Sequence, residues 1–597
     1  MPRRHLLILA ALFLTGCAIY LAWSLTITEP GYPLDDSWIH QVFARNLATG
    51  HGFSFNPDIP MSGATAPLWT LLMGLLWPLM GPIGSGILAG IILEFLAIIA
   101  IYKLTLLITN QNKLALIIAI ITALTSKLIW GALSGMEIGL YSALALWGLY
   151  FYFKSESLSD KWSYLAYILF ALAFLSRPEC ALFVAAAAIR DFFEWFKLPR
   201  KSLIPWLARL AIVAVITIPY FAFNYSVAGS IFPQTYTAKV QGRGLISALG
   251  HGEFKRALKA VTIIPYTYIQ LFAGKIFQIN PFIALAALAG LTKLWSYRGK
   301  LRSRCRMLSL LLLLVLPMMG AFAPLYTPVY HNLRIVAHLV PPIILLGVVG
   351  LFWKGEFKKF KRLFISVGSF LILAGALFLV FDDFFVRHLG PYFLQSLSRM
   401  TSASEYDTLT WFARDLGKQT LFLGGIIISA LIISLTSVQN WLSIRTPQRL
   451  VLGLIILYST ATLFANAVDY AYNVKNINEI DKGIALYLKK HGPAGSTVAV
   501  NDIGAIAYYS DMKVLDLKGL VSPEITPEMI QDDSLAFEYM QKKNRVDYLA
   551  IFPEWFKYIP TRTDIFKREL RLIAYNNTIL ADDTAIVYRA VWPDSIQ

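Results

Sequence analysis

Membrane-length apolar runs recur along most of this 597-residue chain, and they constrain its fold more than any other feature. Crossing the hydrocarbon core of a bilayer takes about 20 apolar residues in a helix. With 57% hydrophobic and 15% charged residues, the composition lies outside the range of soluble globular proteins. The sequence therefore predicts an α-helical polytopic integral membrane protein with about thirteen transmembrane helices. They are expected near 6–25, 86–108, 113–131, 137–153, 163–176, 179–196, 203–222, 280–297, 307–325, 335–353, 363–381, 419–437 and 449–467.

The net charge of +17 follows the loops between these runs. Lysines and arginines gather in alternate short loops, as is typical of the cytoplasmic side of a membrane protein. This pattern predicts a cytoplasmic N-terminus in a cell inner or plasma membrane, with no nucleic-acid partner. The basic loops are those at 3–4, 197–201, 298–306, 354–362 and 445–449.

The remaining loops then fall on the external side of the membrane. The basic loops all fall on the cytoplasmic side only if the segment 67–80, which ends in Trp77-Pro78, lies in the membrane interface and does not cross. We expect the helix to break in the glycine cluster that begins at Gly81. The same reasoning predicts an interfacial or re-entrant segment at 256–279. The external segments are 26–85, 222–279, 382–418 and everything after about 468.

The composition turns polar and mixed after about residue 470, where short strands alternate with helical stretches. We therefore divide the chain into a transmembrane module at 1–468, with a first external loop at 26–85, and an extracytoplasmic α/β domain at 469–597. Strands are expected at 497–500, 514–517, 547–552 and 584–590, and helices at 475–491 and 523–543.

Two adjacent carboxylates, Asp35 and Asp36, follow the first apolar run directly. A charge inside hydrocarbon costs at least ~2.5–3.5 kcal/mol, so the pair needs a reason to lie at a membrane face. Removing a proton from a hydroxyl is one such reason, because a carboxylate near a low-dielectric surface is a competent general base. The other interpretation of Asp36 is a helix cap, a position that Asp favours.

Residues 32–69 resemble the first external loop of the GT-C glycosyltransferases, polytopic enzymes that use polyprenyl-phosphate sugars. The likeness is closest to the bacterial branch of terminal arabinofuranosyltransferase-like and mannosyltransferase-like enzymes. It implies inversion by a single displacement, with Asp35 as base and Asp36 orienting the acceptor or holding a cation. The matching pieces are 34–37, 43–53, 55–57 and 66–69, with further pieces at 134–137, 176–179, 502–508 and 516–520.

Fixed cations on the external side are needed to stabilise the charge of a leaving lipid phosphate. Arg334 is the first candidate and Arg177 the second, because a guanidinium binds phosphate through two parallel hydrogen bonds. Lys239 and His331 are further candidates. The alternative for Arg334 is a cation that only extends from a helix end toward the interface.

Three more residues are expected to bind substrate. Glu137 and Glu179 each begin a span, where a carboxylate either complements the helix dipole or holds an arginine or a sugar hydroxyl. His40 lies four residues after Asp36 and so shares its helix face. One histidine and two aspartates define no particular metal, so a divalent cation stays an open alternative and no other cofactor is expected.

These residues together predict a membrane glycosyltransferase, transferring a hexosyl or pentosyl group. Its expected partners are a polyprenyl-phosphate sugar donor, an extracytoplasmic glycan, lipid or protein acceptor, and membrane lipids. The alternatives are a polytopic transporter or lipid-linked sugar flippase, and a non-catalytic scaffold. A transporter would usually show repeat-related halves and broken helices meeting at the midplane, and the sequence shows neither.

Overall fold

The computed structural model describes residues 1–157, 159–196, 203–240, 245–322, 330–352, 373 and 447–593. The expected spans at 363–381 (apart from position 373) and 419–437, the basic loops at 197–201 and 354–362, and the external segment 382–418 lie outside the described residues. Two compact units divide the chain. The first comprises 1–272, 297–342 and 459–597, the second 273–296 and 343–458, and the candidate site lies within the first.

Helices occupy every other expected span. Most coincide with the apolar runs to within a few residues, because a backbone in hydrocarbon must satisfy its own hydrogen bonds. These helices are α1 (Arg3–Ile27), α3 (Pro67–Thr109), α4 (Asn112–Ala123), α5 (Ser126–Leu133), α6 (Ile138–Lys154), α7 (Lys161–Ser176), α8 (Ala181–Trp195), α9 (Ile204–Ala228), α14 (Pro281–Ser296), α15 (Arg302–Phe322), α17 (Val340–Phe352) and α23 (Pro447–Ile477).

Among the described residues, five helices are long and apolar enough to cross a membrane. A sixth arises if α4 and α5, which meet at a bend of 59°, form one broken span. The prediction of an integral membrane protein is therefore confirmed. The number of thirteen spans stays a prediction.

Helix α3 contains the break that the glycine cluster predicts. Gly81 has φ 67° and ψ −178°, outside the helical region, so that 67–80 and 82–109 are two helices joined at a kink. Pro82 follows directly, and a proline disfavours helical geometry in the residue before it. Leu75 and Leu79, on the first half, are 71% and 81% exposed, which suits a helix in contact with lipid.

The structure of the segment 254–279 differs from the one that the sequence predicts. The sequence predicts an interfacial or re-entrant piece, whereas length and hydropathy place Phe254–Ile279 among the candidate spans. The run consists of α12 (Phe254–Val261) and α13 (Ile263–Ile279), with a break at Thr262. Phe254, Leu258 and Val261 extend the apolar surface by two turns, which the basic residues between them obscure in the sequence.

The tail folds around a five-stranded mixed sheet of order β2-β1-β3-β5-β4. Strand β1 pairs in parallel with β2 and β3, and β5 pairs antiparallel with β3 and β4. The strands are β1 (Thr497–Val500), β2 (Lys513–Asp516), β3 (Tyr548–Ile551), β4 (Phe566–Ile573) and β5 (Thr584–Ala590). Four lie within one residue of the expected positions, and β4 was not predicted.

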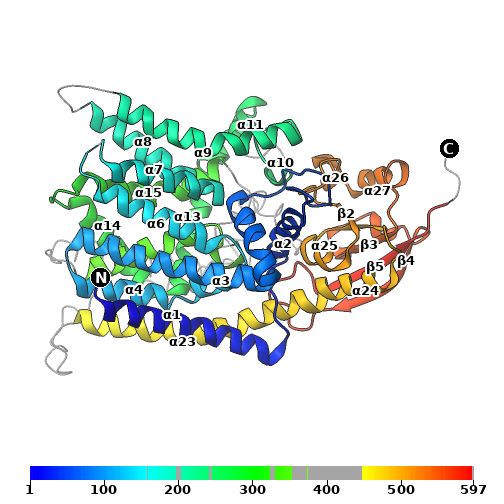
Figure 1. Ribbon diagram of the computed structural model, residues 1–597, viewed down its shortest axis with the longest axis horizontal. Coiled ribbons are helices and arrows are strands. Elements are labelled where there is room, and N and C mark those ends of the chain that lie inside the picture. Colours follow the sequence, from blue (N-terminus) through cyan, green and yellow to red (C-terminus); the bar gives the residue numbers. More distant parts are fainter. Residues whose placement is uncertain are drawn as a thin grey trace. The chain divides into compact units, whose positions relative to one another are not determined.

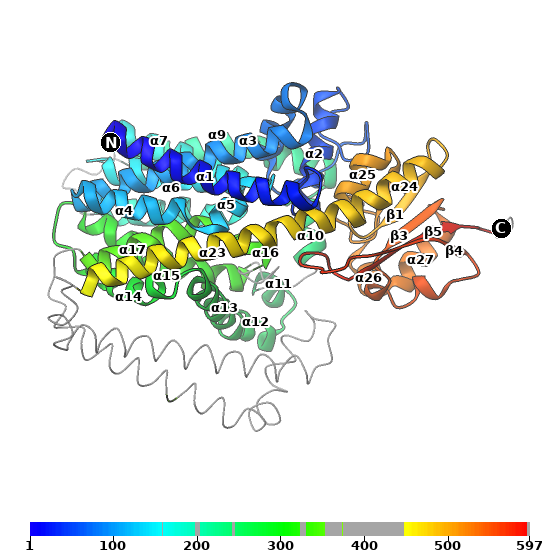
Figure 2. The ribbon, with the colours of Figure 1, turned by 90° about the horizontal axis from the view of Figure 1, so that it is seen from below.

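Helices cover both faces of this sheet (Figure 2). On one side are α26 (Pro527–Gln531) and α27 (Asp533–Lys542), and on the other α24 (Gly483–His491) and α25 (Gly504–Ser510). Successive residues of β1 belong to different hydrophobic cores, because side chains alternate between the two faces of a sheet. Val498 and Val500 pack in the core on one face, and Ala499 packs in the core on the other.

The first external loop completes one of the two cores. Its helix α2 (Asp35–Ala48) lies beside α25 (Figure 1). Val42 and Phe43 of α2 and Phe55 from the following segment belong to the same buried cluster as Val498 and Val500. Burying each such large apolar side chain stabilises the fold by about 1.5–3 kcal/mol. The tail sheet and the first loop are therefore one folding unit, although the proposed boundary at 468/469 stays a prediction.

Candidate active site

A cavity of about 410 Å³ lies between the first external loop, the ends of several apolar helices and one turn of the tail. Most of its wall is apolar, with aromatic side chains from α7 and α9 and methionines from α15. A pocket with an apolar wall and a few convergent polar groups is the usual form of a ligand site. Its acidic and basic lining residues are Asp36, His40, Arg177, Glu179, Lys239 and Arg334.

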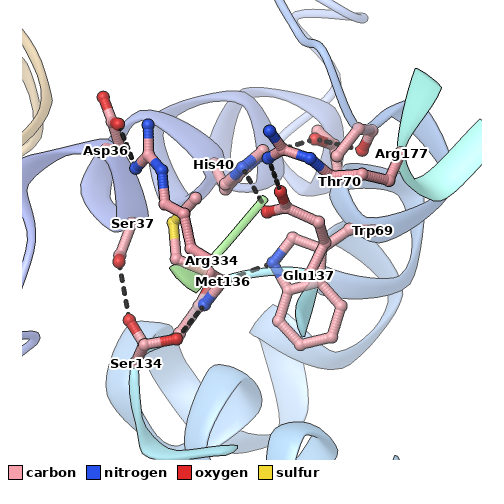
Figure 3. A network of polar contacts seen from close by, with 12 residues as sticks. Asp36, Ser37, His40, Trp69, Thr70, Ser134, Met136, Glu137, Arg177 and Arg334 are labelled. Atoms are coloured by element: carbon pink, nitrogen blue, oxygen red, sulfur yellow. Dashed lines mark hydrogen bonds and ion pairs between the residues drawn. The ribbon is translucent and has the colours of Figure 1, made fainter. Parts of the chain in front are cut away.

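Asp36 and Arg334 form an ion pair on this wall (Figure 3). The Arg334 side chain is 5% exposed and that of Asp36 30%. Arg334 follows Leu333, whose φ of 64° is left-handed and costs a leucine of order 1–3 kcal/mol. Tyr141 donates its hydroxyl hydrogen to the Arg334 carbonyl, and Lys127 Nζ donates to Asn332 Oδ1 at 2.6 Å. The local backbone is thus held in an unfavourable conformation that directs the guanidinium at Asp36.

Glu137 is the centre of a second group of polar contacts (Figure 3). Its side chain is only 1% exposed; one carboxylate oxygen pairs with Arg177, and the other lies 3.5 Å from His40 Nε2. The other ring nitrogen of His40, Nδ1, lies 3.0 Å from Thr70 Oγ1. Arg177 also donates from Nε to Glu179 at 3.1 Å. Glu137 therefore acts from behind the wall, orienting the arginine and the histidine that line the cavity.

The segment before Glu137 explains how its carboxylate reaches this position. Gly135 has φ 73°, and its Cα hydrogen faces the ring of Tyr32 with no room for a Cβ. Ser37 Oγ donates to the Ser134 carbonyl at 2.6 Å, and Trp69 Nε1 donates to the Gly135 carbonyl at 3.0 Å. Only glycine combines this backbone angle with this close approach. These two hydrogen bonds thus fix the turn before Glu137 to α2 and to α3.

Asp35 faces away from the cavity. Its two carboxylate oxygens accept hydrogen bonds from the backbone amides of Gly504 at 2.6 Å and Ala505 at 2.7 Å. The carboxylate therefore lies at the N-terminus of α25, where free amides and the helix dipole favour an anion. Burial raises the pKa of Asp35 to about 6, outweighing the two amide hydrogen bonds, and the neighbouring Asp36 adds to the rise.

Other first-loop residues join the tail in the same way. The side-chain amide of Asn56 donates to the Val514 carbonyl and accepts from the Val514 amide, both at 3.0 Å, as a neighbouring strand would. Arg45 Nη1 donates to the Tyr508 carbonyl at 2.8 Å, and its guanidinium lies 4.9 Å from the centre of the Tyr508 ring. The tail pieces at 502–508 and 516–520, which the family resemblance marked, are among the places where the tail meets the first loop.

The structure brings together most of the predicted site residues. Asp36, His40, Arg177, Glu179, Lys239 and Arg334 line one cavity, and Glu137 lies behind it. Asp35 lies outside the cavity lining, and the side chain of His331 lies outside the described part of the chain. Sequence reasoning missed Thr70, Ser37 and the apolar lining, because neither a single hydroxyl nor an apolar side chain carries a chemical signal on its own.

The divalent cation that the sequence leaves open stays a prediction. Among the residues that the structure describes, no group of three or more His, Cys, Asp and Glu side chains could hold one. Asp36 is engaged with Arg334, and His40 with Glu137 and Thr70. No chemical step is therefore derived through a metal at this site.

A second buried carboxylate, Asp191, provides a contrast at the far end of α6 and α7. Both of its oxygens are engaged, since Tyr152 and Tyr167 donate to them at 2.7 and 2.9 Å. Arg190 and Arg209 pair with the same carboxylate at 3.0 and 2.8 Å. Four side chains thus share the acceptor sites of the Asp191 carboxylate, which lines a separate cavity of about 270 Å³.

Two family models match parts of this chain. Residues 64–223 match the family model described as dolichyl-phosphate-mannose-protein mannosyltransferase, and residues 470–588 match a domain of unknown function, DUF8728. A comparison with curated proteins returns no match.

Solved structures show the same fold. ArnT from Cupriavidus metallidurans in the apo state is 13% identical with a TM-score of 0.53, over 97% of each chain. The same protein bound to undecaprenyl phosphate is 12% identical with a TM-score of 0.51, over 97% of this chain and 98% of that one. Arabinofuranosyltransferase AftD from Mycobacteria is 14% identical with a TM-score of 0.47, over 100% of this chain and 40% of that one. The two ArnT structures confirm the resemblance at the level of the fold.

Proposed function

We propose that this protein is a membrane glycosyltransferase that moves one sugar from a polyprenyl-phosphate donor to a hydroxyl of an extracytoplasmic acceptor. The observation that carries the proposal is the Asp36–Arg334 pair on the wall of a largely apolar cavity. It offers a proton acceptor beside a phosphate ligand, next to surfaces on which a lipid chain can lie. The undecaprenyl phosphate bound by ArnT, which shares the fold, supports a lipid phosphate as the ligand.

Asp36, rather than Asp35, is the better candidate for the general base. A base must come within about 2.6–3.2 Å of the acceptor hydroxyl. Asp36 lines the cavity, whereas both oxygens of Asp35 are occupied by the amides of Gly504 and Ala505. Asp35 then acts as a positioning residue that fixes the start of α2.

The arginines supply the electrostatic part of the reaction. Arg334 pairs with Asp36 and is placed to share its donors with an incoming phosphate. Arg177, oriented by Glu137 and Glu179, provides a second guanidinium on the same wall. Such fixed donors stabilise the charge that develops on the leaving oxygen, and they need little reorganisation to do so.

The step balances without a general acid. The acceptor oxygen gives its proton to Asp36 and bonds to the anomeric carbon on the face opposite the phosphate. The bond between that carbon and the bridging phosphate oxygen breaks, and polyprenyl phosphate leaves as the anion. A single displacement inverts the anomeric configuration. Afterwards Asp36 returns its proton to water.

The test uses the full-length protein in lipid nanodiscs with polyprenyl-phosphate arabinofuranose and mannose, offered with octyl glycoside acceptors. We expect one of these donors to give a glycosylated product, which mass spectrometry identifies together with the sugar class. A transporter or flippase would instead move the labelled lipid across a vesicle membrane without forming product. Transport without product from any of the donors would overturn the proposal.

A further inference from the structure

One turn of the tail, residues 517–522, forms part of the cavity wall. Leu520 and Val521 line the cavity, whereas Lys518 points to the other side, with its ammonium 4.6 Å from the centre of the Trp555 ring. The turn thus presents its apolar side chains to the cavity and keeps its charge away from it. It lies within the stretch that matches a domain of unknown function.

The turn is rigid because it folds around one buried carboxylate. Asp516 is fully buried and accepts hydrogen bonds from the amides of Lys518 at 2.8 Å, Leu520 at 2.5 Å and Val521 at 3.0 Å. Burial raises the pKa of Asp516 to about 6, while these amides act in the opposite direction. A carboxylate that satisfies three loop amides fixes the loop conformation.

The turn is also fixed to the elements that form the rest of the wall. Gln234 begins α10 (Gln234–Val240), and its side-chain Nε2 donates to the Gly519 carbonyl at 3.2 Å. Its backbone N–H donates to the Ser62 carbonyl at 2.9 Å. A Cβ placed on Gly63 would lie 2.9 Å from Val521 Cγ1, so this contact has no spare room. The position of Leu520 and Val521 is therefore set by the first loop as much as by the tail.

The two reactants require different walls. A polyprenyl chain must stay against apolar helices, and Phe174 of α7, Phe221 of α9 and Met319 of α15 provide that surface. The 517–522 turn belongs to none of the candidate spans. The acceptor is the reactant that need not lie along these helices, so it occupies the side of the cavity that the turn forms.

We infer that the 517–522 turn is the acceptor-side wall of the cavity, and that Leu520 and Val521 pack against the carbon face of a sugar acceptor and set its selectivity. This inference rests on the proposed transferase function and extends it to the class of acceptor. Leu520 and Val521 touch the acceptor without taking part in the proton transfer.

The test compares Leu520→Trp with Leu535→Trp, the same change on α27 at a residue that does not line the cavity. Transfer is measured with octyl glycosides of glucose, mannose, galactose and arabinose, and binding of undecaprenyl phosphate is measured separately. We expect Leu520→Trp to raise the acceptor KM about tenfold and to change the ranking of acceptors. The Kd of undecaprenyl phosphate should stay within about twofold, and Leu535→Trp should change neither quantity.

Val521→Ala provides a second variant that enlarges the cavity, and it should favour the bulkier acceptors. Because Val521 is also a core residue, its thermal midpoint is measured alongside. Weaker binding of undecaprenyl phosphate by these variants would place the turn on the donor side and overturn the inference. So would an equal loss for all acceptors with an unchanged ranking, which is the signature of a structural role. If the unchanged protein transfers none of the donor sugars, the proposed function itself fails, and the inference fails with it.

Discussion

The two carboxylates that begin α2 are neighbours in sequence, yet they belong to different regions of the molecule. Asp36 lines the cavity beside Arg334, whereas Asp35 caps α25 of the tail. The pair thus connects the cavity, where a substrate can bind and react, to the start of α25, where backbone amides occupy both oxygens of Asp35. The difference teaches that the surroundings of a carboxylate, more than its place in a motif, indicate whether it can accept a substrate proton.

Glu137 and Asp191 extend this comparison. Both are almost fully buried and both hold arginines, but Arg190 and Arg209, which pair with Asp191, do not line the cavity. Arg177, held by Glu137, lines the cavity and faces an open volume. Arg190 and Asp191 line a separate cavity of about 270 Å³, so the two ion pairs differ in which cavity they reach and not in burial alone.

Arg334→Lys is expected to have a large effect on the cavity side. Lysine keeps the positive charge but cannot form the two parallel hydrogen bonds that a guanidinium makes with a phosphate. We expect kcat to fall about 100-fold, as is typical when one fixed donor to a developing anion is lost. The measurement is steady-state transfer from the donor that the unchanged protein accepts.

Arg190→Lys is the matched control, since Arg190 pairs with Asp191 and does not line this cavity. We expect its transfer rate to stay within about twofold of the unchanged protein. Equal losses of transfer rate in Arg334→Lys and Arg190→Lys would show that any buried arginine of this fold has the same effect. The distinction between the cavity and the Asp191 cluster would then be wrong.

A smaller effect is expected on the tail side from Gly504→Ala. A Cβ at this position would collide with the backbone carbonyl and carboxylate of Asp35, so the contact between α2 and α25 must shift. Such overpacking costs about 1–3 kcal/mol, and we expect a lower thermal midpoint with a roughly tenfold lower transfer rate.

Gly453→Ala serves as its control, because a Cβ there meets nothing within 4 Å on α23. Alanine inside a helix should leave stability unchanged or slightly raised. If Gly504→Ala were as harmless as Gly453→Ala, the tail would not hold Asp35 in the way described.

The pH dependence of stability should carry the smallest signal. The pKa of Asp35 is about 6 in the folded protein, above the ordinary value of about 3.9. The folded state therefore binds more protons than the unfolded state between about pH 4 and 6, and this group's contribution to stability falls as the pH rises through that window. The full difference is at most about 3 kcal/mol.

Asp35→Asn removes this titration but leaves that of Asp516, whose pKa is also raised to about 6. Thermal midpoints measured from pH 4 to 7 should therefore decline less steeply for Asp35→Asn than for the unchanged protein. Parallel curves would mean that the Asp35 carboxyl is not buried against α25.

The fold was largely accessible from sequence because apolar runs and alternating strands are local signals. Strand β4 was missed, since Lys567, Arg568 and Arg571 make it resemble a solvated helix. Those charges are understandable at the edge of a sheet, where they discourage pairing with another chain. The membership of most site residues could also be predicted, because charged side chains at the external ends of apolar helices are costly unless they bind a partner or a substrate.

The division of roles between Asp35 and Asp36 could not be predicted. Successive residues of a helix point about 100° apart, so the two carboxylates must face different neighbours. Which one faces the cavity depends on Arg334 and Gly504, which are hundreds of residues away along the chain. The place of Val521 on the cavity wall was also missed, because an apolar residue in a polar domain normally indicates a core, and Val521 does belong to one.

The most direct test of this account is the transfer rate of Asp35→Asn and Asp36→Asn with the same donor and acceptor, with thermal midpoints confirming that both fold. If Asp36 is the base, its replacement should lower kcat about 1,000-fold, whereas Asp35→Asn should retain activity within about tenfold. The reverse order, with Asp35→Asn inactive and Asp36→Asn active, would contradict the account and identify Asp35 as the base.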